Sequence, residues 1–153
     1  MANTYSQIYI QMVFAPYARM NLIPMRHREE IQKYITGIVT NQGCKMLAIG
    51  GMPDHTHVLV GLHPGTAISD LVREVKSESS SLINSRHWVQ GKFAWQTGYG
   101  AFSYGHSQLS AVIAYIERQE EHHRRRTFRD EYLSLLRKFR VQYDDQYLFE
   151  WAD

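Results

Sequence analysis

The sequence predicts an α+β domain built on one antiparallel sheet, and the spacing of its apolar residues is the reason. In some segments apolar residues alternate with polar ones, as on a half-buried strand, and in others they recur every three to four residues, as on an amphipathic helix. In chain order the first six segments are strand, helix, strand, strand, helix, strand. This order is typical of a ferredoxin-like sheet with both helices on one face. The 153 residues, 44% of them hydrophobic, suffice for one such domain spanning residues 1–153.

The first half of the chain supplies a strand, a helix and two further strands. Residues 5–15 alternate apolar and polar side chains, and one face of this strand carries Ile8, Ile10, Met12 and Phe14. From Met25 the apolar spacing becomes helical and lasts until Gly43, a residue type that commonly ends helices. Residues 45–50 form a short strand, and a Gly-Gly-Met-Pro-Asp turn leads into a longer strand over residues 55–62.

The second half supplies a helix, an extended region rich in aromatic residues and two more helices. The second helix is predicted over residues 66–86, with Thr66 as its N-cap. Residues 93–96 and 99–104 are extended, and their aromatic side chains either stack on unpaired bases or pack in the core. A third helix follows Ser107 and runs to about residue 123, and Thr127 begins a fourth. The apolar tail, residues 141–153, is expected to dock on this subunit or on another.

A pair of histidines begins the third predicted strand. His55 and His57 are two residues apart, so they project from the same face and can share one metal ion. The apolar side chains that follow point the other way, toward the helices, and these are Val58, Val60 and Leu62. We therefore expect the open face of the sheet to hold a functional site. The alternative is a strand that carries two partly exposed histidines without a role.

Composition excludes several classes of protein. A single cysteine, Cys44, rules out an internal disulfide and fits a reducing compartment. No apolar run approaches the roughly 20 residues that span a bilayer. We expect a soluble cytoplasmic protein without membrane contacts. The formal net charge is only +2, but Arg124, Arg125 and Arg126 are consecutive. This run either contacts phosphate backbones or is a solvated helix face.

Three stretches of the sequence together resemble one family. They read MPDHTHVL over residues 52–59, WQTGYGAFS over residues 95–103 and YIERQEEHH over residues 115–123. Together they resemble the HUH single-tyrosine transposases of small bacterial insertion sequences, the IS200-like family, and the related REP-associated tyrosine transposases.

The resemblance implies an activity and a set of site residues. It implies metal-assisted cleavage and rejoining of single-stranded DNA, in which Tyr115 attacks the phosphate and forms a 5′-phosphotyrosine intermediate. His55, His57 and Gln119 would be the ligands of a divalent metal, Mg²⁺ or Mn²⁺, because imidazole nitrogens and a carboxamide oxygen suit these ions. The covalent link conserves the phosphodiester energy, so rejoining needs no ATP.

The resemblance also implies partners. These would be single-stranded element ends, which are expected to be hairpins, and a second copy of the chain. In the homodimer Tyr115 of one protomer would complete the histidine site of the other. Lys76 matches a lysine expected in the family, so we place it with the arginine run as a DNA contact. The alternative is that Lys76 lies on an ordinary solvent-exposed helix face.

Other functions fit parts of the sequence. One is a non-catalytic ferredoxin-like module that binds nucleic acid, another is a domesticated REP-associated nuclease, and a third is a metal hydrolase in which His55 and His57 activate water. Metal dependence and a covalent DNA adduct separate them. We assign no catalytic role to His122, which is expected to be neutral and solvated, and we interpret Asp54 as a turn residue.

Overall fold

The chain forms a four-stranded antiparallel sheet in the computed structural model, which describes residues 3–18, 20–122 and 125–152, with only the backbone described at His122. The strand order is β2-β3-β1-β4. The strands are β1 (Tyr9–Phe14), β2 (Lys45–Met52), β3 (His55–Gly61) and β4 (Gly100–Tyr104). Because β1 and β3 are central and every neighbouring pair is antiparallel, the predicted ferredoxin-like fold is confirmed.

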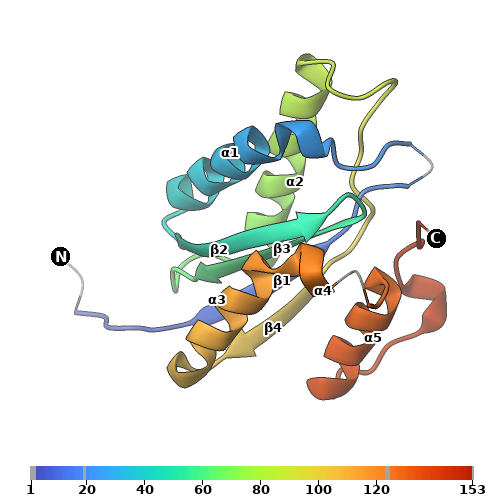
Figure 1. The fold of residues 1–153 in the computed structure, drawn as a ribbon. Coiled ribbons are helices and arrows are strands. Elements are labelled where there is room, and N and C mark those ends of the chain that lie inside the picture. Colours follow the sequence, from blue (N-terminus) through green and yellow to red (C-terminus); the bar gives the residue numbers. More distant parts are fainter. Residues whose placement is uncertain (1–2, 19, 123–124, 153) are drawn as a thin grey trace.

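Two helices, α1 (Arg28–Asn41) and α2 (Ile68–Ser85), cover one face of the sheet (Figure 1). The strand side chains predicted to face helices do so, and the main core contains Ile10, Met12, Phe14, Val58 and Val60 together with apolar residues of both helices. Among the described residues, no helix is long and apolar enough to cross a membrane.

The predicted cap of the second helix is wrong. The residue before α2 is Ala67, whose backbone is extended and which has no side-chain cap. The Thr66 hydroxyl instead donates to the carbonyl oxygen of Gln42 at 2.9 Å. Thr66 therefore ties the start of α2 to the end of α1, and the tertiary contact replaces the local one.

The opposite face of the sheet is also covered, which corrects the expectation of an open face. It carries α3 (Leu109–Glu117), α4 (Gln119–His122) and α5 (Phe128–Lys138) (Figure 1). Ile116 of α3 packs on Ala48 and Leu59, and α5 packs on Val13 and Phe102. The apolar half of each helix needed a partner, and this face of the sheet was the surface available within the chain.

The third predicted helix is divided into α3 and α4 at Arg118, whose backbone leaves the helical region with φ −108° and ψ 28°. The fourth helix begins as predicted, since the Thr127 hydroxyl accepts from the Asp130 amide at 3.1 Å. The tail docks on its own chain, where Phe149 is buried against Phe128 and Tyr132.

Helix α3 lies against β2 so closely that one position needs glycine. A Cβ atom at Gly50 would overlap the backbone carbonyl oxygen of Ile116. Neither of these groups can swing away, because one belongs to the sheet and the other to the helix. Gly50 therefore permits the contact that holds the tyrosine-bearing helix in place.

We predict that Gly50→Ala destabilises the protein by about 1–3 kcal/mol, the usual cost of an overpacked contact. The measurement is urea unfolding at equilibrium. Gly37→Ala is the matched control, because a Cβ at this exposed position of α1 would meet nothing within 4 Å and should stabilise the helix by about 0.5–1 kcal/mol. Equal stability of the Gly50 variant and the natural chain would contradict this packing of α3.

Candidate active site

The two histidines lie side by side on β3, on the face away from α1 and α2. Their ring centroids are 5.0 Å apart, as expected for one shared face of a strand. Both side chains are 0% exposed, so the alternative of two partly exposed histidines does not describe them. Phe128, the first residue of α5, stacks on the His55 ring with centroids 4.2 Å apart. Helix α5 thus closes the site that the sheet alone would leave open.

One nitrogen of each imidazole is bound to an oxygen that orients the ring. Nδ1 of His55 donates to Oδ1 of Asp54 at 2.7 Å, and Nδ1 of His57 donates to Oε1 of Gln11 at 2.6 Å. The amide of Gln11 in turn donates to the Tyr104 hydroxyl at 2.6 Å. Asp54 therefore does more than form a turn, and Gln11 on β1 is a site residue that the sequence analysis missed. Both contacts orient the rings so that Nε2 is the nitrogen that faces the cluster.

The second nitrogens point at oxygen atoms. His55 Nε2 lies 2.8 Å from Oε1 of Gln119, and His57 Nε2 lies 2.9 Å from Oε1 of Glu131. The same Glu131 oxygen is 3.4 Å from His55 Nε2. Ligand atoms of the two histidines and Glu131 all lie within 4.8 Å of one another.

This arrangement fits a bound cation. Nε2 of both histidines and side-chain oxygens of Gln119 and Glu131 converge in a buried volume, and a cation between them would be stabilised by all four atoms. Imidazole, carboxylate and carboxamide groups form a mixed nitrogen and oxygen set that suits Mg²⁺ or Mn²⁺. His55, His57 and Gln119, which sequence reasoning grouped, are brought together, with Glu131 as an added oxygen donor.

Glu131 is the principal residue that sequence reasoning missed. It lies on α5, is 0% exposed, and its Oε2 accepts from the Gln119 amide at 3.1 Å and from the Tyr115 hydroxyl. The helical spacing of apolar residues in this segment contained a signal for its burial. Position 131 lies three residues after Phe128 and one before Tyr132, within the apolar stripe of α5, so an acidic residue there is expected to be buried.

Tyr115 is half-buried on α3, and its hydroxyl joins this cluster. The hydroxyl donates to Glu131 and accepts from Nη2 of Arg126 at 3.1 Å. Burial, with the neighbouring Glu131 charge, raises the pKa of Tyr115 to about 12, while Arg126 acts in the opposite direction. At neutral pH the phenol is therefore protonated, and its proton is directed at a carboxylate.

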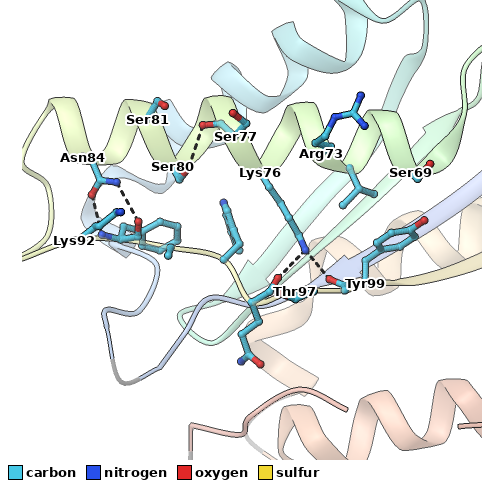
Figure 2. A pocket seen from close by; sticks show the side chains of 16 residues that line it. Ser69, Arg73, Lys76, Ser77, Ser80, Ser81, Asn84, Lys92, Thr97 and Tyr99 are labelled. Carbon is cyan, nitrogen blue, oxygen red and sulfur yellow. Dashed lines mark hydrogen bonds between the residues drawn. The ribbon is translucent and has the colours of Figure 1, made fainter. Parts of the chain in front are cut away.

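The basic residues predicted to contact DNA lie in different parts of the structure. Lys76 lies on α2, across the sheet from the histidines, and donates to the carbonyl oxygens of Gln96 at 2.8 Å and Gly98 at 2.6 Å (Figure 2). Burial lowers the pKa of Lys76 to about 8. Lys76 therefore fastens the segment before β4 to α2.

Of the two described residues of the arginine run, Arg125 and Arg126, Arg126 contacts the cluster through the Tyr115 hydroxyl. Arg125 is exposed and lies beside Asp54 in a surface hollow. Arg124 and the side chain of His122 lie outside the described part of the chain. The predicted DNA contacts of Lys76 and of the three arginines stay predictions.

Comparison with known proteins places the chain in a family. The family model described as "Transposase IS200 like" matches residues 4–119, which is more than half of the chain. A search of curated proteins gives no match.

Two solved structures share the fold. A candidate transposase from Deinococcus radiodurans R1 is 22% identical, with a TM-score of 0.59, over 78% of this chain and 95% of that one. A REP-associated tyrosine transposase bound to a REP hairpin is 14% identical, with a TM-score of 0.55, over 76% of this chain and 68% of that one. The family match ends at Gln119, so α5 with Glu131 lies beyond it. The chain belongs to the IS200-like transposase family.

Proposed function

We propose that this transposase cleaves and rejoins single-stranded DNA with Tyr115 as the nucleophile. The observation that carries the proposal is the convergence of the Tyr115 hydroxyl, two imidazoles, the Gln119 amide and the Glu131 carboxylate in one buried cluster. Family membership supports DNA transposition, and the similar REP-associated transposase is bound to a REP hairpin. Element ends folded as hairpins are the proposed substrate.

The two oxygen atoms of the Glu131 carboxylate have separate roles in this proposal. Oε1 lies with the histidines, where His55, His57, Gln119 and Glu131 would hold Mg²⁺ or Mn²⁺. The ion would stabilise negative charge on the phosphate as a Lewis acid. Asp54 and Gln11 keep the two rings aimed at that point.

The other oxygen of Glu131 serves Tyr115. Because the phenol pKa is about 12, a proton must leave as the oxygen attacks, and Oε2 already accepts that hydrogen. The Tyr115 oxygen bonds to phosphorus and the bond from phosphorus to the 3′ oxygen breaks, which leaves a 5′-phosphotyrosine and a free 3′-hydroxyl. The departing 3′ oxygen takes up a proton from water, so the hydroxyl is released neutral. Attack by another 3′-hydroxyl reverses these steps and joins two strands.

A homodimer that exchanges its tyrosine helices is the second part of the proposal. In the single chain, Tyr115 lies beside its own His57, with ring centroids 6.2 Å apart. An exchange would reproduce the same contacts between two protomers, with Gly105 before α3 as the point where the chain redirects. Two tyrosines would then serve the two strand ends of one event.

We predict that Tyr115→Phe abolishes cleavage and the covalent adduct, while DNA binding changes little, because only the attacking oxygen is lost. Labelled single-stranded element ends are incubated with Mg²⁺ and resolved on a denaturing gel. Tyr147→Phe is the control, because Tyr147 is 78% exposed, and this variant should cleave DNA normally. An adduct formed by the Tyr115 variant would place the nucleophile elsewhere, and cleavage without any adduct in the natural protein would indicate a hydrolase.

We predict that Glu131→Gln weakens Mn²⁺ binding by about 10–100-fold, as expected when a charged group next to the metal is neutralised. Electron paramagnetic resonance of added Mn²⁺ measures the affinity directly, without reference to cleavage. Glu120→Gln removes the same charge from an exposed position of α4 and should bind as the natural chain does. An unchanged affinity in the Glu131 variant would restrict the ligands to His55, His57 and Gln119.

Mixing two inactive proteins tests the exchange of helices. Tyr115→Phe and His57→Ala protein, each first shown to be folded by circular dichroism, should together recover about a quarter to a half of the activity, because some mixed dimers carry one intact site. Proven subunit exchange without recovered cleavage would mean that each chain uses its own tyrosine.

A further inference from the structure

Two surface hollows lie beside the buried cluster, and Arg126 lines both. The first, about 320 Å³, lies between α3 and α5 and reaches Tyr115. The second, about 590 Å³, lies next to Asp54 and the end of β2. A DNA strand that presents a phosphate to Tyr115 must place the adjoining nucleotides in surface hollows of this kind, because the histidines themselves are fully buried.

The first hollow has the chemistry of a nucleotide site. Arg126 and Lys138 supply two positive charges, and none of the described residues that line it is acidic. The rest of its wall combines two uncharged polar residues, Gln11 and Ser134, with apolar and aromatic ones, which are Tyr104, Ala111, Val112, Tyr115 and Leu135. The volume lies within the range of about 300–1,000 Å³ that is usual for small-molecule pockets. The second hollow contains Asp54 and Asp130, whose carboxylates would repel phosphate.

The first hollow is also connected to the site by hydrogen bonds. The Tyr104 hydroxyl accepts from Gln11, and Gln11 accepts from His57. On the other side, Arg126 donates to the Tyr115 hydroxyl. A nucleotide in this hollow would therefore contact groups that position both a metal ligand and the nucleophile.

We propose that the hollow between α3 and α5 binds one unpaired nucleotide of single-stranded DNA, next to the phosphate that Tyr115 attacks. Lys138 and Arg126 contact its phosphates, and its base lies against Tyr104 and the apolar wall. The base must be unpaired, because a base within a duplex is stacked and cannot enter a side pocket. This inference rests on the proposed function, and it assigns binding to α5, which lies beyond the family match.

The larger groove along α2 is a weaker candidate. It is lined by Arg73 and Lys76, but Arg73 pairs with Asp70 at 3.1 Å and Lys76 is bound to two backbone carbonyls (Figure 2). The groove also lies on the face of the sheet away from Tyr115. Arg73 and Lys76 are thus engaged within the protein, and Lys92 is the third cation that lines the groove. The groove serves here as the competing site in the test.

Two neighbouring positions of α5 provide a matched test. Lys138 lines the hollow and Arg137 does not, although both are exposed. Binding of a short fluorescein-labelled oligothymidine is measured by anisotropy in EDTA, across a series of salt concentrations. We expect Lys138→Gln to weaken binding about threefold or more and to lower the salt slope by about 0.7, the value for one phosphate contact on a single strand. Arg137→Gln should change both far less.

Photocrosslinking locates the base. An oligothymidine carrying 5-iodouracil should attach to a peptide that contains Tyr104 or residues 111–115, and attachment to residues 69–84 of α2 would overturn the proposal. Equal effects of Lys138→Gln and Arg137→Gln, or no binding by the natural protein, would overturn it as well. Binding is measured without metal and without cleavage. The result can therefore be interpreted even if the proposed chemistry of Tyr115 proves wrong.

Discussion

The buried carboxylate of Glu131 is the interaction on which the site depends. A carboxylate without partners would be costly to bury, and this one is 0% exposed. It is stabilised by hydrogen-bonding contacts with three side chains from three other elements: His57 on β3, Gln119 on α4 and Tyr115 on α3. Each contact fixes the position of a residue proposed for chemistry. One charge on α5 therefore organises groups from elements that are distant in sequence.

The sequence predicted the sheet better than the arrangement around it. Alternation and helical spacing identified the four strands and the two helices behind them, because those segments bury one face against a single layer. The cap at Thr66 failed because its hydroxyl makes a tertiary contact with Gln42 instead. The break at Arg118 was not predictable from local pattern, since no glycine or proline marks it.

The site was also predicted only in part, because local patterns identify some of its residues and tertiary folding brings in the others. The spacing of His55 and His57 fixed their shared face, and family resemblance identified Tyr115 and Gln119, which lie four residues apart across the helix break. Gln11 carries no local motif, and the helical spacing around Glu131 indicates only that it is buried. Both residues belong to the site only because β1 lies next to β3 and α5 folds onto the same face.

The stack of Phe128 on His55 has a thermodynamic consequence. The ring that begins α5 rests on a proposed metal ligand, and Glu131, one turn later, supplies another. The affinity for the cation and the equilibrium between docked and undocked α5 are then linked. If a bound ion favours the docked helix by a given factor, undocking of the helix lowers the affinity for the ion by the same factor. The part of the chain that begins at Phe128 would thereby set the occupancy of a centre whose histidines belong to the sheet.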